Sequence, residues 1–165
     1  MIAPLAALVL FSAQTPTQAA PSPAEAQIGA VLNHMHAAAE AADGATYFSL
    51  FTPDARFIGT DTTERWSLAQ FRAYAEPYFA QGRGWTYAPR ERTITVAPID
   101  CRCIAWFDEV LDNAGYGEVR GSGVLRLTDD GWKIEQYVLS FAVPNDRANQ
   151  VVEAIKAPAP PRPQP

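Results

Sequence analysis

The spacing of hydrophobic residues changes once along the chain, close to Gly84. In residues 24–42, apolar side chains recur every three or four positions, which predicts an amphipathic helix. Residues 43–55 predict a short second helix that ends at the Thr52–Pro53 pair, because a residue before proline is biased away from helical geometry. Residues 67–84 predict a third helix, with Ser67 as its N-cap and Gly82 and Gly84 at its end.

Beyond Gly84, apolar and polar residues alternate and β-branched and aromatic residues become frequent, which is typical of strands. Four strands are predicted, at 85–99, 101–111, 116–127 and 131–143, with turn sequences at 112–115 and 128–131. Residues 56–60 predict a short earlier strand, 62–66 a loop, and 146–157 a closing helix. Helices followed by an antiparallel meander indicate the α+β class.

The late strands carry apolar residues at both parities. Trp106, Val110, Val124, Trp132, Ile134 and Val138 share one parity, and Phe107, Leu125, Leu127, Leu139 and Phe141 share the other. A sheet with one solvated face shows cleaner alternation, so both faces are expected to be covered. Helices would cover one face, and a second copy of the chain is the economical cover for the other. The sequence therefore predicts a homodimer formed through the sheet face.

Both ends differ in composition from residues 25–156, which are expected to form the folded domain. Residues 2–11 are apolar but too few to span a bilayer, and the small residues after them, up to 20, resemble a signal-peptide cleavage site. We therefore expect residues 1–20 to be a signal peptide, and the protein to be periplasmic or secreted. No Lys or Arg precedes the apolar run, so a start placed too early or a disordered apolar leader is the alternative. Residues 157–165 are proline-rich and predict a disordered tail.

Charge narrows the classes of partner. The 165 residues carry a net charge of −5 and contain no cluster of Lys and Arg. This excludes a phosphate-neutralising surface, so we expect no nucleic-acid partner and no membrane contact beyond export. A small molecule or another protein remains as the partner.

Cysteine and histidine are scarce. Cys101 and Cys103 are two residues apart, and in an extended strand this spacing is at or beyond the limit for an unstrained disulfide. We expect two half-buried thiols and, with too few ligands nearby, no metal site. His34 and His36 point to different sides of the first helix, so each is expected to be a surface or core residue.

Several motifs taken together resemble a known family. The segments "FTPDARFIGTD", "ERW", "GRGW", "AWFDE", "RGSGVL" and "DGWKI" follow one another in an order that is similar to the SnoaL-like branch of the nuclear-transport-factor-two-like superfamily. The resemblance covers about residues 25–155. It implies a cone-shaped, curved antiparallel sheet that wraps around the N-terminal helices and encloses an apolar cavity. It implies no single activity, because the superfamily holds isomerases, dehydratases, hydrolases, cyclases and binding modules.

The resemblance also suggests where a catalytic base would lie. Family isomerases place it a few residues after the Asp-Ala start of the first strand, which here corresponds to Gly59–Asp61. Gly59 has no side chain, so Asp61 is the candidate. The histidine pair that the dehydratase relatives use has no counterpart in this sequence.

The adjacent carboxylates in "AWFDEVL" raise a second possibility. If the 112–115 turn pairs Asp108 with Arg120, the two side chains could form an ion pair that binds a polar group or orients a water. A purely structural pair is the other interpretation, and a one-residue shift would place Phe107 opposite Arg120 instead. Glu109 is expected to be solvated near the strand end.

The sequence leaves two functions open. The first is a module that binds a small, largely apolar molecule in an internal cavity, forms a homodimer, or does both. The second is an isomerase, hydratase or cyclase that needs no cofactor, with Asp61 or Asp108 as base and Arg120 or Tyr137 as electrophile. The aromatic residues expected to line the cavity are Phe57, Trp66, Tyr78, Trp85, Trp106 and Tyr137.

Overall fold

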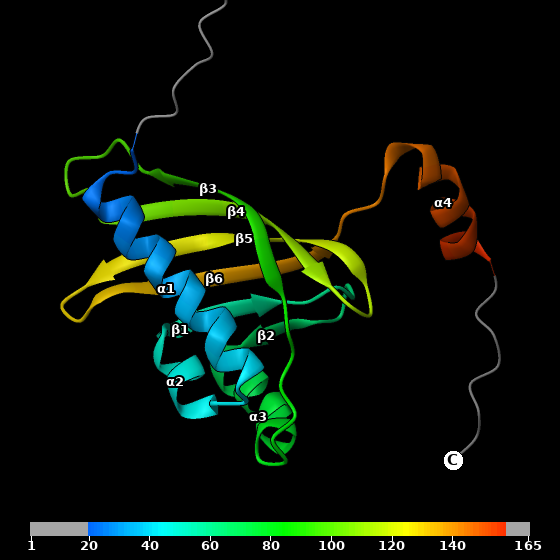
Figure 1. Ribbon diagram of the computed structural model, residues 1–165, viewed down its shortest axis with the longest axis horizontal. Coiled ribbons are helices and arrows are strands. Elements are labelled where there is room, and N and C mark those ends of the chain that lie inside the picture. The colour runs from blue at the N-terminus through cyan, green and yellow to red at the C-terminus, as the bar shows by residue number, and fades with distance from the viewer. Residues whose placement is uncertain (1–19, 158–165) are drawn as a thin grey trace, which may run out of the picture.

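The computed structural model describes residues 20–157, which form helices and one curved, unclosed sheet of six strands (Figure 1). The fold is α+β, as predicted. The predicted signal peptide, apart from residue 20, and the proline-rich tail, apart from residue 157, lie outside the described residues. Within residues 20–157, no helix is both long enough and apolar enough to cross a membrane.

Three helices precede or interrupt the first strands, and side-chain caps fix where they begin. Helix α1 (Pro23–Glu40) starts with a capping box in which Ser22 and Glu25 bond to each other's backbone, and α3 (Leu68–Phe79) starts with the same arrangement between Ser67 and Gln70. The side chain of Asp43 caps the short helix α2 (Gly44–Ser49).

The sheet has the strand order β2-β1-β6-β5-β4-β3. The predicted antiparallel meander is present as β3 (Ala88–Val96), β4 (Ile104–Asn113), β5 (Gly117–Thr128) and β6 (Gly131–Phe141). Two further strands complete it, β1 (Phe51–Ile58) and β2 (Arg65–Ser67). β1 lies parallel to β6, a pairing that the sequence analysis did not include.

β1 begins earlier than predicted and contains the proline that was expected to end α2. Phe51 pairs with Ile134 of β6, and the register then shifts before Arg56. Pro53 lies within this irregular stretch, where a missing backbone N–H interrupts no regular ladder. The predicted loop at 62–66 is likewise shorter, because Trp66 pairs with Phe57 and forms part of β2.

A bulge in β6 corrects the predicted assignment of side chains to the two faces. Val124 pairs with Gln136 and Leu125 pairs with Ile134, so one extra residue is inserted at Glu135. The insertion reverses the alternation within the strand. Trp132, Ile134, Tyr137 and Leu139 are therefore all buried on the inner face, together with Phe107 and Leu125 of the neighbouring strands.

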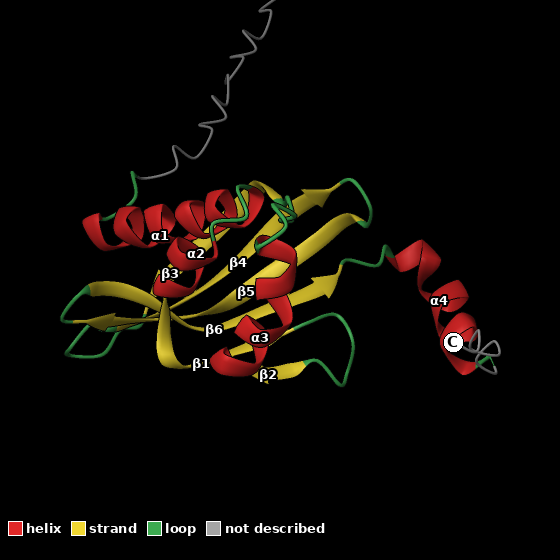
Figure 2. Cartoon of the chain, turned by 90° about the horizontal axis from the view of Figure 1, so that it is seen from below, coloured by secondary structure: helices red, strands yellow, loops and turns green. Residues whose placement is uncertain are grey.

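The helices cover this inner face unevenly. α1 contacts β3 and β6, whereas α3 contacts β1 and β2, and the short α2 lies between α1, α3 and β1. Figure 2 shows α1 running along the sheet and α3 beside β1 and β2. The outer face of β4 and β5 carries Trp106, Asp108, Arg120 and Val124, and Trp106 is 46% exposed.

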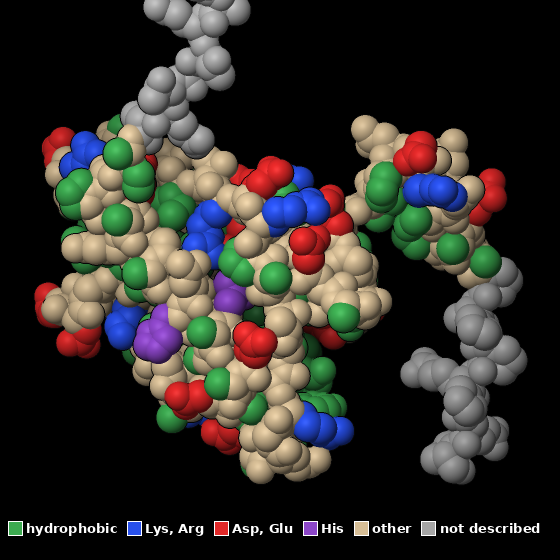
Figure 3. All heavy atoms as spheres, viewed as in Figure 1, with side chains coloured by type: hydrophobic (Ala, Val, Ile, Leu, Met, Phe, Trp, Pro, Cys, Tyr) green, Lys and Arg blue, Asp and Glu red, His purple; other side chains and the backbone are tan. Residues whose placement is uncertain are grey.

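The C-terminal helix α4 (Ala148–Lys156) follows a short 3₁₀ turn (Asn145–Arg147) and stands apart from the sheet (Figure 1). None of its residues is buried, and Ile155 is 77% exposed. Figure 3 shows hydrophobic side chains grouped along this helix.

Cys101 and Cys103 form a disulfide, contrary to the predicted thiols. The prediction assumed an extended strand, but these residues lie in the turn between β3 and β4. Arg102 between them has a φ of 45°, which brings the two Cα atoms to 5.1 Å, within the usual range for a disulfide.

Candidate functional site

A hollow of about 450 Å³ lies among the β1–β2 loop, the β4–β5 hairpin and the segment before β3. Figure 1 shows the β1–β2 loop and the β4–β5 hairpin at the same end of the sheet. We call it the aromatic hollow, because seven of its lining residues are aromatic. The residues that line it are Phe57, Gly59, Thr60, Glu64, Trp66, Phe71, Tyr74, Gly84, Trp85, Thr86, Tyr87, Asn113, Tyr116 and Leu139. Its size suits a small organic molecule.

Stacked rings form one wall of the aromatic hollow. Phe57 stacks on Phe71 with ring centroids 3.8 Å apart, and Trp66 stacks on Tyr74 at 4.9 Å. Trp85 packs obliquely on Phe71 at 6.1 Å. Because each ring is held by the next, the wall is preorganised, which lowers the entropy that a ligand must lose on binding.

The ionisable groups of the aromatic hollow are phenols and one carboxylate. Burial raises the pKa of Tyr87 to about 12, with further contributions from the neighbouring phenols of Tyr116 and Tyr74 and from the Glu64 carboxylate. Burial also raises the pKa of Tyr74 above its ordinary value, again with a contribution from Glu64. Both phenols are therefore protonated at neutral pH and keep a hydrogen to donate.

The six aromatic residues predicted to bind a ligand separate into four locations. Phe57, Trp66 and Trp85 line the aromatic hollow. Tyr78 lines a smaller adjoining hollow with Arg83 and lies outside the larger one. Trp106 faces outward from β4. Tyr137 is buried behind Phe57, whose ring stacks on it at 5.7 Å. The structure thus brings three of the six together on one wall, and their role in binding stays a prediction.

Asp61 lies in the loop between β1 and β2 with an exposed side chain, and it is absent from the residues that line the aromatic hollow. Its carboxylate accepts hydrogen bonds from the backbone N–H and the hydroxyl of Thr63, and these bonds lower its pKa. Glu64, three residues later, is the carboxylate that lines the hollow. The sequence signal for Glu64 was the "ERW" motif, in which it stands two residues before Trp66.

Asp108 and Arg120 do not pair, because the predicted register of β4 and β5 is wrong by two residues. Asp108 lies opposite Ser122, and Arg120 lies opposite Val110. β4 continues through the first half of the predicted turn, so that Asn113 pairs with Gly117 and the turn lies at 114–116. Both charged side chains are exposed on the outer face, away from the aromatic hollow.

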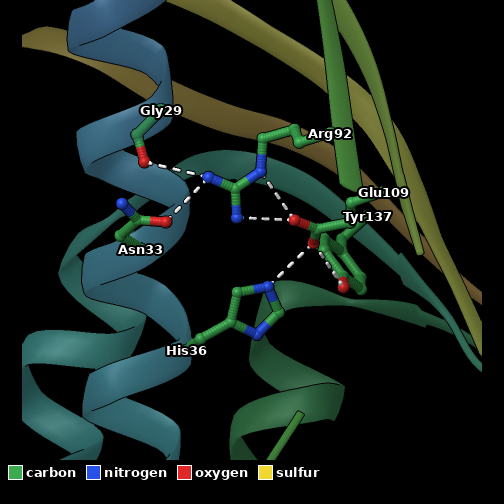
Figure 4. A network of polar contacts seen from close by, with 6 residues as sticks. All are labelled: Gly29, Asn33, His36, Arg92, Glu109 and Tyr137. Atoms are coloured by element: carbon green, nitrogen blue, oxygen red, sulfur yellow. Dashed lines mark hydrogen bonds and ion pairs between the residues drawn. The ribbon is translucent and has the colours of Figure 1, made fainter. Parts of the chain in front are cut away.

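Glu109, predicted to be solvated, is instead the centre of a buried polar network (Figure 4). Its side chain is 0% exposed. Oε1 lies 2.8 Å from Nε2 of His36 and accepts a hydrogen bond of 3.2 Å from the hydroxyl of Tyr137. Oε2 accepts a hydrogen bond of 2.7 Å from Nε of Arg92. Nη2 of Arg92 also lies 2.6 Å from Oε2, in an ion-pair contact whose angle does not make a second hydrogen bond.

Arg92 links this network to α1. Its Nη1 donates to the side chain of Asn33 at 2.7 Å and to the carbonyl of Gly29 at 3.2 Å. The network, which consists of His36, Arg92, Glu109 and Tyr137, thus joins helix α1 to strands β3, β4 and β6 (Figure 4). Gly121 makes room for it, since a Cβ there would collide with the Tyr137 hydroxyl and with Glu109.

The charge state of the network follows from its contacts. Burial acts to raise the pKa of Glu109, but the hydrogen bond from His36 and the Arg92 guanidinium outweigh it, so the pKa lies below its ordinary value. Glu109 is therefore ionised at neutral pH. Burial and the Glu109 charge raise the pKa of Tyr137 well above its ordinary range.

No member of the network lines the aromatic hollow, and each oxygen of Glu109 already has its partners. The arrangement can hold α1 against the sheet, but it offers a ligand in the hollow no free group. Within residues 20–157, no three His, Cys, Asp or Glu side chains gather closely enough to hold a metal ion.

Sequence comparison places most of the domain in one family. A family model described as "SnoaL-like domain" matches residues 28–144. No curated protein matches the chain.

Solved structures of similar fold come from several bacteria. One, a domain of unknown function with a cystatin-like fold from Nostoc punctiforme, has a TM-score of 0.64 and 17% identity, and the match covers 85% of this chain and 90% of that one. An NTF2-like protein of unknown function from Pseudomonas putida has a TM-score of 0.61 and 14% identity, with 77% and 91% covered.

A candidate ketosteroid isomerase from Shewanella frigidimarina has a TM-score of 0.56 and 20% identity, with 72% of this chain and 98% of that one covered. At these identities the likeness establishes the fold alone. The match over residues 28–144, the order of the elements and the NTF2-like fold of these neighbours agree, and the chain belongs to the SnoaL-like domain family.

Proposed function

We propose that this SnoaL-like domain binds a small, largely apolar molecule in the aromatic hollow. The observation that carries the proposal is the hollow itself, about 450 Å³ in size and walled by stacked rings. Such a wall favours a flat apolar body, because aromatic faces gain contact area without losing side-chain freedom.

The alternative, an isomerase, hydratase or cyclase with a cavity aspartate as base, receives less support. Asp61 and Asp108 both lie off the described wall of the hollow, and Glu64 is the carboxylate that lines it. A catalytic role would therefore fall to Glu64, with a phenol such as Tyr87 as the neighbouring donor.

Calorimetric titration with 2-naphthylmethanol, a neutral bicyclic probe, tests the binding proposal. We expect saturable binding to the wild type and its loss in Thr86→Trp, because Thr86 lines the hollow and a larger side chain there fills it. Thr93→Trp is the matched control, since Thr93 is exposed on the edge strand β3 and lies outside the hollow. Equal binding to wild type and Thr86→Trp would contradict the proposal.

We also propose that the domain forms a homodimer through the outer face of the sheet. The support is the exposed Trp106, with half-buried Val110, Val124 and Val138 on the same face. A second copy of this face would cover these groups by symmetry. We expect light scattering to give the mass of a dimer for the wild type and of a monomer for Trp106→Glu.

Ile99→Glu is the control for the dimer, because Ile99 is similarly exposed but lies in the turn between β3 and β4. It should leave the mass unchanged. A monomeric wild type would rule out this second proposal without affecting the first.

A further inference from the structure

The wall of the aromatic hollow has an asymmetric charge. Among the described residues that line it, Glu64 is the one with a formal charge, and Lys, Arg and His are absent from that set. The remaining lining groups are aromatic rings, phenols, small residues and Asn113. An anionic ligand would find no charged partner there, whereas a cation would find Glu64.

Asn113 adds no free acceptor to the wall. Its amide nitrogen donates to the carbonyl of Thr86, and its oxygen accepts from the backbone N–H groups of Gly115 and Tyr116. The side chain therefore serves to tie the hairpin to the segment before β3. Among the ionisable lining groups, the Glu64 carboxylate and the phenols are left to meet a ligand.

The loop that carries Glu64 holds it against the hollow. The backbone N–H of Gly59 donates to the carbonyl of Glu64 at 2.8 Å, and the backbone N–H of Glu64 donates to the carbonyl of Asp61 at 3.0 Å. The side chain folds back over Gly59, where a Cβ would collide with it. Oε2 accepts a single hydrogen bond, from the backbone N–H of Asp61 at 3.2 Å. The carboxylate is thus positioned by the backbone and keeps acceptor capacity.

Aromatic side chains surround the same space. Trp66, Trp85, Tyr87 and Tyr116 all line it together with Glu64. The face of an aromatic ring carries a negative quadrupole, which attracts a cation, and tryptophan does so most strongly. Rings and a carboxylate around one hollow are the groups that recognise an ammonium.

Arg83, which lies next to the hollow, does not neutralise this arrangement. Arg83 lies in the smaller adjoining hollow, and its guanidinium carbon is 5.1 Å from the centre of the Tyr78 ring. It is therefore engaged outside the wall. The chain as a whole, with a net charge of −5, also favours the approach of a cation.

We propose that the ligand of the aromatic hollow is an organic cation, an amine or quaternary ammonium group carried on an apolar body, with Glu64 as its counter-ion. The inference rests on the proposed binding function and gives the chemical class of its ligand. The apolar body lies against the stacked rings, and the ammonium group lies beside Glu64.

Three naphthalene probes of similar shape and different charge separate this proposal from the binding function itself. They are 2-naphthylmethylamine, which is cationic at neutral pH, the neutral 2-naphthylmethanol and the anionic 2-naphthoate. We expect the amine to bind about tenfold more tightly than the alcohol, and the carboxylate to bind least. Equal binding of amine and alcohol would overturn the cation proposal and leave the binding function standing. No binding by any probe would overturn both.

Glu64→Gln assigns the preference to one residue. Glutamine keeps an oxygen for the Asp61 N–H and removes the charge, so the ratio of amine to alcohol affinity should fall to about one. Glu153→Gln makes the same change in net charge on the exposed helix α4 and should keep the ratio. An unchanged ratio in Glu64→Gln would contradict the proposal. Circular dichroism of both variants checks that they are folded.

Discussion

The molecule contains two carboxylates in aromatic surroundings, Glu109 inside the network and Glu64 on the wall of the hollow. Glu109 is fully buried and shares its oxygens among His36, Arg92 and Tyr137. Glu64 is half buried and accepts one hydrogen bond from its own loop. The carboxylate oxygens of Glu109 are therefore occupied, whereas those of Glu64 can still accept hydrogen bonds.

This difference indicates which of the two carboxylates is available to a ligand. A buried ion pair with all partners in place is what a fold needs to hold its elements together, and it is poor grounds for assigning catalysis. Unused acceptor capacity beside an open hollow is what a ligand can exploit. The network is therefore assigned to the stability of the domain, and the hollow is the proposed binding site. Four changes, given in order of decreasing effect, test this division.

Glu109→Ala should have the largest effect. It leaves the buried guanidinium of Arg92 without its counter-ion, and removal of one partner of a buried pair costs about 3–5 kcal/mol. Urea unfolding at neutral pH measures the loss. The double variant Arg92→Met/Glu109→Leu removes both charges and should recover most of the stability. If Glu109→Ala costs less than about 1 kcal/mol, the network does not support the fold.

Acid should weaken the same network. The pKa of Glu109 lies below 4.5 in the folded chain, so its contribution to stability is complete above pH 4.5 and is lost as the pH falls through the folded pKa. We expect the gap in unfolding free energy between wild type and Glu109→Gln to shrink below pH 4.5. Urea titrations of both proteins across the acid range measure the gap. A gap that widens in acid would show that the pKa is raised instead.

Tyr137→Phe should have an intermediate effect. The change deletes one hydrogen bond to Glu109 and leaves the ring in place against Phe57, which predicts a loss of about 1 kcal/mol. Tyr78→Phe, at an exposed position on α3, should cost less than about 0.5 kcal/mol. Because the Tyr137 hydroxyl lies behind the wall and Tyr78 lies outside the aromatic hollow, the affinity for the probes should stay within about twofold of the wild type in both variants.

Asp108→Asn and Arg120→Gln should have the smallest effects, within about 0.5 kcal/mol of the wild type in unfolding free energy. Both side chains are exposed on the outer face and do not pair with each other. Calorimetric titration with 2-naphthylmethylamine should show unchanged affinity. A loss of binding in either variant would move the functional site to the outer face.

The sequence predicted the elements well and their side-chain directions poorly. Periodicity and caps located α1, α3 and the meander within a few residues, because these signals are local. The faces of β6 were misassigned because the extra residue at Glu135 reverses alternation, and nothing in the local pattern marks it.

The site depended on non-local geometry. A two-residue error in the hairpin placed Arg120 opposite Asp108, and adjacent carboxylates gave no local sign that the second one turns inward to Arg92 and His36. Phe57, Trp66 and Trp85 could be named from the sequence because the family resemblance implied an apolar cavity, which aromatic side chains suit. Glu64 was missed because the base position that the resemblance implies ends at Asp61.

The parallel pairing of β1 with β6 has a consequence for how the chain folds. Phe57 and Tyr137 lie side by side in the sheet although they come from opposite ends of the domain sequence. Contacts between distant segments must wait for a large loop to close, which slows folding. The meander can form as soon as its own strands exist, but the wall that β1 contributes to the hollow waits for β6. During synthesis, therefore, the proposed binding site should be among the last parts of the domain to mature.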